Sequence, residues 1–501
     1  MFIGMTVALL QLFSAVAGAE TSSGKGVPAP ESFTVTTDHK GTFGSKAMAY
    51  RAVVSSMALK KENGDIYADV VTTAYLAKKT SSTRPVTFVF NGGPGSSSVW
   101  LHMGLLGPKL VQVPSDAKDA GLAPYRLVDN PDTVLDLTDL VFIDPVGTGY
   151  SRLAGVGKPE DVYGLAEDAR SVAQIVREWI RRNNRWNTPI YIVGESFGTT
   201  RAAAMIPYLE RGDEPVRING LVLISQALDY TGSTPAADNL VAFVTYLPTM
   251  AATAVYHGKV MIGNRSLEDY LAEVRAFAVD SYLPALFKGT SLPPADFDRI
   301  AARLSVYLGI SEAYIKRARL RVLAGRFVKE LLRSEGLSVG RLDGRYKTNE
   351  VDDTDVSPRY DAGSAAISGA YSAAFHQYAR TDLKVTLDRP YYISGPEVER
   401  EWVWARPDGG YSEPNYVNTA PDLANGMRHN PHMRVFLASG YYDYATPFFD
   451  GEYTFWRHGI DMRRVTARYY PAGHMMYVHQ PSLKALASDL RLWFQSGGQG
   501  W

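Results

Sequence analysis

The sequence predicts an α/β fold in which a mostly parallel central sheet is covered by helices on both faces. Two observations lead to this class. Short, β-branched apolar runs with the pattern of buried strands alternate with helical segments in the first half of the chain and again near its end. One of these runs passes directly through a tight, glycine-flanked turn into a helix, which is the order of a strand–turn–helix unit.

Composition places the chain among soluble globular proteins with a large core. It has 501 residues, of which 46% are hydrophobic and 21% are charged. The formal net charge is zero, so no nucleic-acid partner or anionic surface is indicated. The absence of cysteine excludes disulfides, thiolate metal sites and a cysteine nucleophile.

Residues 1–19 are predicted to be a signal peptide. The stretch is apolar, ends in the small-x-small pattern Ala17-Gly-Ala19, and is followed by a polar segment over 20–30. It contains no Lys or Arg, so an N-terminal membrane anchor or a misplaced start is the alternative. No other stretch is long and apolar enough to span a bilayer. We therefore expect an exported protein, periplasmic or secreted, without stable membrane insertion after cleavage near Ala19.

The first part of the chain contains two kinds of strand pattern, one before and one after about residue 80. Residues 32–79 alternate polar and apolar residues and are rich in Thr, Val and Tyr, which predicts N-terminal antiparallel strands. Buried strands and helices then alternate, as a parallel sheet requires. The predicted strands are 86–90, 139–143, 190–193 and 218–224, with a long amphipathic helix over 161–184.

From residue 229 to residue 422 the sequence no longer alternates predicted strands with helices. Helices are predicted over 267–277, 294–304 and 311–333, separated by joints rich in Pro and Gly. Strands over 433–438 and 465–470 and a closing helix over 483–494 then restore the α/β pattern. We predict one core, formed by 20–228 and 423–501, interrupted by a mainly helical lid over 229–422.

Ser196 is the predicted nucleophile. It lies in Gly194-Glu-Ser-Phe-Gly198, between the strand 190–193 and a helical stretch from Thr200, an order typical of the nucleophile elbow of the α/β-hydrolase fold. Such a turn lifts the hydroxyl above the sheet, and an ordinary helix-start serine is the alternative. Gly336-Leu-Ser-Val-Gly340 also matches the pattern, but Ser338 follows a charged helical stretch, so we interpret it as a turn.

A serine hydroxyl needs a base, and the base needs an orienting group. In α/β hydrolases the acid and then the histidine follow the serine along the chain. His474 lies in a glycine-containing loop directly after a strand and before the last helix, so it is the predicted base. Asp443 is the first carboxylate after the strand 433–438, so it is the predicted acid, with a turn-capping role as the alternative.

Other histidines and carboxylates fit these positions less well. His458 ends a helix and His479 lies beyond the tight turn, so both are expected to be surface or packing residues. His429 and His432 precede a strand, which is the wrong end for a site on a parallel sheet. Asp450 and Glu452 lie further into the following helix and are expected to be solvated.

The tetrahedral intermediate of acyl transfer needs two donors for its oxyanion. One is expected from the backbone N–H after the nucleophile, at Phe197. The other is expected from the glycine-rich loop after the strand 86–90, where Gly92-Gly93 permits an inward-turned backbone. An ordinary surface turn is the alternative for this loop.

Together these motifs resemble the serine carboxypeptidase family, the relatives of carboxypeptidase Y and cathepsin A. The resemblance covers about 85–225 and 433–494 and implies a triad of Ser196, Asp443 and His474 and an oxyanion hole formed by Gly93 and Phe197. The matching pieces are Asn91-Gly-Gly-Pro-Gly-Ser-Ser-Ser98, Gly107-Pro108, Asp144-Pro-Val-Gly-Thr-Gly-Tyr-Ser151, Gly194-Glu-Ser-Phe-Gly198, Gly440 to Pro447 and Gly473-His474.

The resemblance also implies that Asn91 and Glu195 bind the C-terminal carboxylate of the substrate. Two ionised carboxylates repel, so Glu195 has to be protonated to donate, which predicts activity favoured at acidic pH. The chain departs from the family at Leu105, where an acidic residue is frequent, and at Ser96, where cysteine is usual. The pattern Tyr441-Tyr-Asp443 looks like a bacterial branch.

The sequence therefore predicts an exported serine carboxypeptidase that acts on a peptide or small acyl substrate through an acyl-enzyme at Ser196, with no metal or cofactor. Tyr150, Phe197 and Tyr442 are candidates to line side-chain pockets, with ordinary packing as the alternative. An esterase or acyltransferase on the same triad is the competing enzyme. A binding or scaffold protein with a silent site is the alternative from another class.

Overall fold

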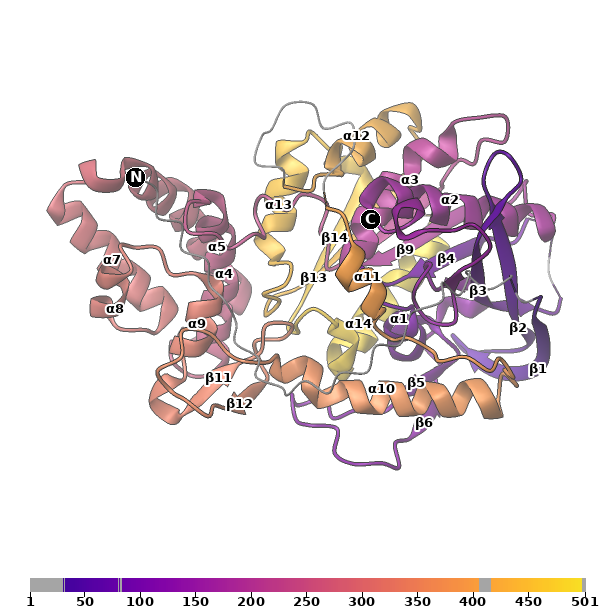
Figure 1. The fold of residues 1–501 in the computed structure, drawn as a ribbon. Coiled ribbons are helices and arrows are strands. Elements are labelled where there is room, and N and C mark those ends of the chain that lie inside the picture. Colours follow the sequence, from indigo (N-terminus) through magenta and orange to yellow (C-terminus); the bar gives the residue numbers. More distant parts are fainter. Residues whose placement is uncertain (1–29, 31, 80, 82, 405–415, 498–501) are drawn as a thin grey trace, which may run out of the picture.

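The computed structural model describes residue 30 and residues 32–79, 81, 83–404 and 416–497 (Figure 1). The predicted signal peptide over residues 1–19 lies outside the described residues. Within those residues, no helix has both the length and the apolar character needed to cross a membrane.

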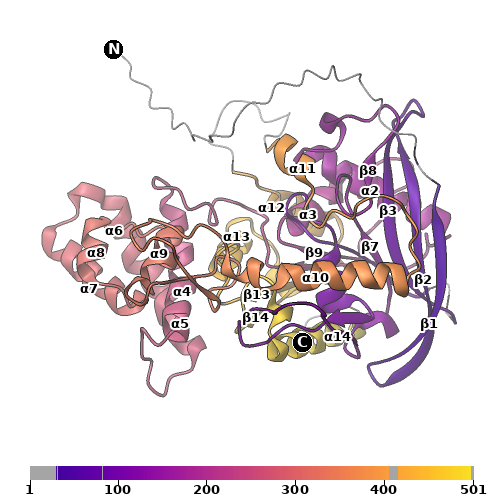
Figure 2. The same ribbon diagram turned by 60° about the horizontal axis from the view of Figure 1, so that its bottom comes forward.

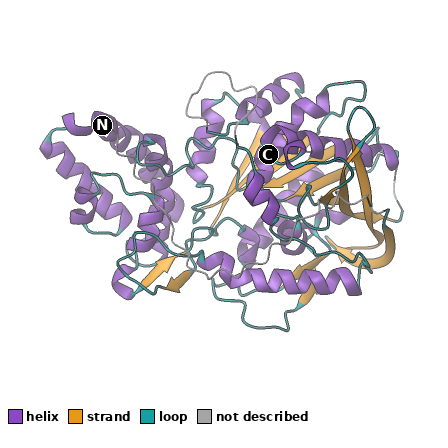
Figure 3. Ribbon diagram, in the orientation of Figure 1, coloured by secondary structure: helices purple, strands orange, loops and turns teal. Residues whose placement is uncertain are grey.

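Among the described residues, ten strands form one central sheet, shown as orange arrows in Figure 3, with the order β1-β2-β3-β7-β4-β9-β10-β13-β14 and β8 paired to β3. The strands β1 to β3 and the β3–β7 pair are antiparallel, and every later pair from β7 to β14 is parallel. The bounds are β1 Thr34–Phe43, β2 Lys46–Lys60, β3 Ile66–Ala77, β4 Val86–Phe90, β7 Asp139–Ile143, β8 Arg152–Leu153, β9 Ile190–Glu195, β10 Gly220–Ile224, β13 Arg434–Gly440 and β14 Val465–Tyr470. This confirms the predicted mostly parallel sheet with antiparallel strands at its N-terminal side.

Helices cover both faces of the parallel strands. Successive side chains of a strand point to opposite faces, so each strand contributes to two hydrophobic clusters. Phe88 and Ile192 pack in one hydrophobic cluster with the helices α2, α3 and α12. Val89 and Val193 pack in a second cluster with α1, α10 and α14. The bounds are α1 Val99–Leu101, α2 Leu165–Arg182, α3 Phe197–Glu210, α10 Ala362–Thr381, α12 Ala420–His429 and α14 Gln480–Gln495. This two-sided burial explains why the strands are apolar runs without alternation.

The chain between β10 and β13 is mainly helical. The helices α4 to α9 stand beside the sheet at the left of Figure 1 and share a hydrophobic cluster of their own. The long helix α10 instead lies along the core, as Figure 2 shows. The bounds are α4 Leu240–Tyr256, α5 Leu267–Phe277, α6 Leu283–Lys288, α7 Pro294–Leu308, α8 Glu312–Arg317, α9 Ala324–Glu330 and α11 Pro396–Glu401, with a two-stranded sheet of β11 Leu337–Val339 and β12 Lys347–Asn349. Outside the insertion, β5 Lys109–Val111 and β6 Leu127–Asp129 form another two-stranded sheet, and α13 Phe448–Arg457 follows β13.

Two local predictions in this region are wrong. The single helix expected over 311–333 is interrupted, because Arg319 and Leu320 have positive φ values of 54° and 67°, which right-handed helix cannot continue through. Ser338 lies not in a turn but in the strand β11, where it is buried and its hydroxyl donates to Glu350 Oε1 at 2.5 Å.

Two carboxylates expected to be solvated are instead covered by the insertion. Asp450, on α13, is fully buried, and Glu452 accepts a hydrogen bond from Arg275 of α5 at 2.9 Å. The helix α13 packs against α4, which comes from a distant part of the sequence. The expectation of solvent exposure is therefore wrong because it considered only the helix that carries the two residues.

Replacing Asp450 by asparagine is expected to stabilise the protein at neutral pH. Burial, reinforced by the nearby charge of Asp229 and opposed by Arg457, raises the pKa of Asp450 well above its usual range. A carboxyl group with a raised pKa in the folded state disfavours folding once the pH rises above its unfolded-state pKa. The difference in free energy of unfolding between Asp450→Asn and the wild type, measured with urea, should grow from pH 4 to pH 8. The same difference at both pH values would contradict this prediction.

Candidate active site

Ser196 occupies a strained turn between β9 and α3. Its φ is 59° and its ψ −131°, a backbone conformation that non-glycine residues rarely adopt and that is frequent at functional sites. The turn is held by hydrogen bonds from Ser196 N to Ile224 O at 3.0 Å and from Thr199 N to Ser196 O at 2.8 Å. A Cβ atom at Gly194 would lie 2.4 Å from the carbonyl oxygen of Gly198, so a side chain at Gly194 would prevent this turn.

Asp443 and His474 form a buried pair on the loops that follow β13 and β14. His474 Nδ1 lies 2.7 Å from Asp443 Oδ2. The same carboxylate accepts hydrogen bonds from the Thr446 hydroxyl at 2.6 Å and from the backbone N–H groups of Ala445 and Thr446 at 2.8 and 3.0 Å. These bonds satisfy the carboxylate and fix the imidazole ring. Sequence reasoning missed Thr446, although it lies only three residues after Asp443.

The end of β10 connects this pair to Ser196, the predicted nucleophile. Ile224 O accepts the hydrogen bond of Ser196 N, and the hydroxyl of the next residue, Ser225, donates to His474 O at 2.7 Å. No hydrogen bond joins the Ser196 hydroxyl to His474 among the residues described. The structure thus brings the predicted acid and base into contact and places Ser196 at the same edge of the sheet.

The electrostatics of His474 suit a general base. Burial alone would lower the pKa of the imidazole, but the adjacent carboxylate of Asp443 outweighs it and raises the pKa above its usual value. The charged form that arises when His474 takes a proton is therefore stabilised by its partner.

The glycine-rich loop after β4 rests directly on the elbow. A Cβ atom at Gly92 would lie 2.4 Å from Phe197 N and 2.6 Å from Gly198 N, so any side chain at Gly92 would push the loop away. Gly93 has a φ of 104°, which glycine adopts without strain. The two predicted oxyanion donors, Gly93 and Phe197, therefore belong to segments in van der Waals contact.

Asn91 and Glu195 are joined by a hydrogen bond next to the nucleophile. Asn91 Nδ2 donates to Glu195 Oε1 at 2.9 Å, and Asn91 Oδ1 accepts from Leu101 N at 3.0 Å, which fixes the orientation of the amide. Both side chains are almost completely buried. Burial raises the pKa of Glu195 to about 7, and the opposing charges of His474 and Asp443 make smaller contributions.

The surroundings of Glu195 are apolar and aromatic. Leu105 is buried in the helical segment His102–Leu106. Tyr477, from the His474 loop, and Tyr371, from α10, lie close enough to Glu195 that its charge acts on both hydroxyls. Sequence reasoning missed both. Tyr477 could have been found from its place beside His474, whereas Tyr371 gives no signal because it comes from the insertion.

Arg201 is a second residue that the sequence did not reveal. It is buried on α3 and binds Asp168 of α2 through Nε at 2.6 Å and Nη2 at 3.2 Å. Its Nη1 donates to the carbonyl oxygen of Asn91 at 2.6 Å. The guanidinium carbon also lies 5.3 Å from the ring centroids of both Phe90 and Phe197. Arg201 therefore ties the glycine-rich loop to the helix that follows the nucleophile.

The other candidates lie apart from this site. His458 binds Asp229 Oδ2 at 2.8 Å and His479 binds the Ser482 hydroxyl at 2.7 Å. His429 is in the last turn of α12 and His432 precedes β13. Of the pocket candidates, Tyr150 packs against Tyr391, Tyr442 against Tyr256, and Phe197 against Trp402 and Trp404.

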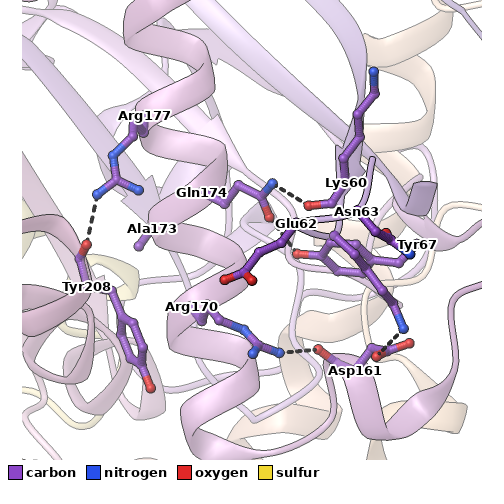
Figure 4. A pocket seen from close by; sticks show the side chains of 11 residues that line it. Lys60, Glu62, Asn63, Tyr67, Asp161, Arg170, Ala173, Gln174, Arg177 and Tyr208 are labelled. Atoms are coloured by element: carbon purple, nitrogen blue, oxygen red, sulfur yellow. Dashed lines mark hydrogen bonds and ion pairs between the residues drawn. The ribbon is translucent and has the colours of Figure 1, made fainter. Parts of the chain in front are cut away.

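A hollow of about 720 Å³ elsewhere on the molecule contains none of the predicted site residues. It lies between α2 and the β2–β3 turn (Figure 4). Its polar groups bind each other: the Tyr67 hydroxyl donates to Gln174 Oε1 at 2.8 Å, and Arg177 Nη2 donates to Tyr208 O at 2.8 Å. We therefore place the functional site at the nucleophile elbow and not in this hollow.

Comparison with known proteins agrees with the motifs. Residues 73–219 match the sequence model of the family Peptidase_S10, serine carboxypeptidase. This range contains the glycine-rich loop and the elbow but neither Asp443 nor His474. No curated protein matches the chain.

Among solved structures, a similar one is Kex1, a prohormone-processing carboxypeptidase from Saccharomyces cerevisiae. It is 13% identical, with a TM-score of 0.54, and the match covers 90% of this chain and 93% of that one. A thermophilic esterase from Thermogutta terrifontis and a proline iminopeptidase from Mycobacterium smegmatis are both 12% identical with TM-scores of 0.34. Their matches cover 89% and 92% of this chain and 99% of each of theirs. Residues 73–219 are thus similar to the serine carboxypeptidase family, and the likeness to Kex1 agrees with the α/β-hydrolase fold that the sheet shows.

Proposed function

We propose that the protein is an exported serine carboxypeptidase that removes C-terminal amino acids through an acyl-enzyme on Ser196. The observation that carries the proposal is the buried Asn91–Glu195 pair beside the elbow. A carboxyl group with a pKa raised to about 7 can stay protonated there and donate to a substrate carboxylate. The export step rests on the apolar segment before Ala19, and N-terminal sequencing of the secreted protein should begin at Glu20.

In the proposed mechanism His474 takes the proton of the Ser196 hydroxyl while the oxygen attacks the scissile carbonyl carbon. Asp443 stabilises the imidazolium that forms. The backbone N–H groups of Gly93 and Phe197 bind the oxyanion of the tetrahedral intermediate. His474 then gives its proton to the leaving amine, the C–N bond breaks, and water repeats the same steps on the ester to release the new C-terminal carboxylate.

Asn91 and Glu195 would select for a free terminal carboxylate. The Asn91 amide has a second N–H besides the one that holds Glu195, and the protonated Glu195 has one O–H. Both can donate to the substrate carboxylate. The site would therefore reject a C-terminal amide, which offers only one acceptor oxygen and leaves one of these buried donors unpaired.

The insertion would cover this site as a lid. Ser97 N, in the glycine-rich loop, donates to Ile393 O at 2.9 Å, and Gly149 pairs with Tyr392 by backbone hydrogen bonds in both directions. These bonds hold the end of the insertion against the two glycine-rich loops. We infer a cover that shapes the pocket walls.

An esterase or acyltransferase on the same triad is the second candidate, and Leu105 is the observation that favours it. Without an acid at that position Glu195 cannot share a proton with a second carboxyl group. Hydrolysis of a blocked dipeptide, its C-terminal amide and a simple ester between pH 4 and pH 8 separates the two. Release of the terminal amino acid from the free acid alone supports the carboxypeptidase, whereas ester turnover without peptide turnover supports the alternative.

In the wild type, kcat/KM for peptide hydrolysis is expected to fall at alkaline pH, and in the Glu195→Gln variant this fall should be absent. Above a pH of about 7 the wild-type carboxyl ionises and repels the substrate carboxylate, so kcat/KM should fall by about tenfold per pH unit. Glutamine carries no charge at any pH and keeps an N–H donor. The pH profile of a simple ester serves as the control, because it has no carboxylate to repel. An unchanged decline in Glu195→Gln would refute the role of Glu195.

A further inference from the structure

Arg341 brings a positive charge from the insertion to the edge of the candidate active site. It follows β11 and is solvent-exposed. Its carbonyl oxygen accepts a hydrogen bond from Tyr444 N at 3.0 Å, and the carbonyl oxygen of Leu342 accepts one from His474 N at 2.6 Å. The backbone of Arg341 and Leu342 is thus bound to the residue after the predicted acid and to the predicted base itself.

The Arg341 side chain lines a cavity of about 330 Å³ between the insertion and the acid loop. The insertion lines it with Tyr246, Val328 and Val339, and the acid loop lines it with Tyr444. Its volume is at the lower end of the range of small-ligand pockets and fits one amino-acid side chain. Arg341 is the one cation among the residues that line the cavity, which also include apolar side chains and the carboxylate of Asp361. Apolar surface beside a guanidinium suits a side chain with methylene groups and a terminal anion.

The guanidinium of Arg341 forms no hydrogen bond or ion pair with the described part of the chain. The nearest carboxylate in the same cavity, Asp361, is already occupied, because it accepts the backbone N–H groups of Arg341 at 2.6 Å, Leu342 at 3.0 Å and Ser364 at 2.7 Å. Asp361 therefore caps α10 and orders the backbone of the segment. An unpaired guanidinium beside a cavity is available to a ligand.

Arg341 and the Asn91–Glu195 pair have different neighbours around the candidate active site. The positive charge of Arg341 partly opposes the rise in the pKa of Tyr230, Tyr246 and His474, so it lies within electrostatic reach of all three. Tyr230 packs against Trp404, which in turn packs on Phe197, the residue after the nucleophile. Glu195, in contrast, is flanked by Tyr371 and Tyr477. If the terminal residue of the substrate binds at Asn91 and Glu195, Arg341 and its cavity beside the acid loop are available to the residue before it.

We propose that Arg341 and this cavity form a subsite for an anionic side chain, aspartate or glutamate, on the residue whose carbonyl carbon is attacked by Ser196. This proposal rests on one part of the proposed function, the acyl-enzyme on Ser196, and does not require that the substrate be a peptide with a free C-terminus. Arg341 is then a specificity residue that contacts the substrate side chain and takes no part in proton transfer.

The test compares two blocked dipeptides that differ only in charge, with Glu-Phe and Gln-Phe as their C-terminal sequences. A hydrogen bond between charged groups is worth about 1.5–3 kcal/mol, so wild-type kcat/KM should be at least about tenfold higher for the Glu substrate. In Arg341→Gln this ratio should fall to about one. Arg341→Lys should retain part of it, because lysine keeps the charge without the planar fork. Arg326→Gln is the matched control, since Arg326 is an exposed arginine on α9 that does not line the cavity, and its ratio should equal that of the wild type.

The p-nitrophenyl esters of blocked Glu and blocked Gln separate failure of the subsite from failure of the proposed function. Dipeptide hydrolysis with a Glu-to-Gln ratio near one, or with the same ratio in Arg341→Gln, overturns the subsite and leaves the carboxypeptidase standing. Selective turnover of the Glu ester that depends on Arg341, without dipeptide turnover, keeps the subsite and overturns the carboxypeptidase. No turnover of either pair overturns both.

Discussion

Replacing Ser196 by alanine is expected to lower kcat for dipeptide hydrolysis by about 10⁴- to 10⁶-fold, since loss of the nucleophile of a serine triad leaves only the contributions of binding and of the oxyanion hole. The variant should fold, because alanine is smaller and the turn at this position is held by backbone hydrogen bonds to Ile224 and Thr199. Steady-state kinetics with a blocked dipeptide measures the loss. A fluorophosphonate should label the wild type at Ser196 and leave Ser196→Ala unlabelled.

The chain contains its own matched control for this experiment. Ser338 lies in a Gly-x-Ser-x-Gly sequence too, but in the strand β11, with its hydroxyl bound to Glu350. It has no adjacent histidine partner among the described residues. The Ser338→Ala variant should keep wild-type kcat and full labelling. Labelling of Ser338, or activity that survives in Ser196→Ala, would show that the nucleophile has been assigned to the wrong serine.

Replacing Arg201 by methionine is expected to destabilise the fold by about 3–5 kcal/mol, the usual cost of removing one partner of a buried ion pair. Burial raises the pKa of Asp168 even while Arg201 opposes the shift. Without the guanidinium the carboxyl is favoured in its protonated form, so the loss of stability should be larger at pH 8 than at pH 5. Guanidinium chloride unfolding at the two pH values measures this difference.

A second variant separates the structural role of Arg201 from its contact with Asn91. In Asp168→Leu/Arg201→Met both charges are replaced by apolar groups, which is often neutral for stability. Stability should return, but KM for the free-acid dipeptide should stay raised because nothing then holds the carbonyl oxygen of Asn91. Wild-type stability of Arg201→Met alone, or a wild-type KM in the double variant, would contradict this assignment.

The sheet was predictable because its signal is local. Strands such as β4 and β9 are buried on both faces and are therefore continuous apolar runs. The candidates Ser196, Asp443 and His474 were predictable for a related reason: each follows a strand of the same parallel sheet, so the three chain segments must end at one edge.

What the sequence did not reveal depends on contacts between distant segments. Asp450 was expected in solvent from its place in the helix that follows Asp443, but it is buried where α13 packs against α4. In the sequence, Arg201 looks like any arginine of a helix. Only the fold shows that its guanidinium binds Asp168 and the carbonyl oxygen of Asn91. Tyr371 and Arg341 come from the insertion, whose sequence pattern predicts helices but not the side chains that face the core.

The insertion contributes two side chains near the candidate active site, Tyr371 beside Glu195 and Arg341 near the predicted base. The serine, the acid and the base all belong to the sheet domain, as does the hydrogen-bonded end of β10. The proposed chemistry and carboxylate recognition are therefore encoded apart from the proposed subsite for the neighbouring side chain. Evolution could exchange the accepted side chains by altering the insertion alone, which would let one catalytic core diversify into many specificities.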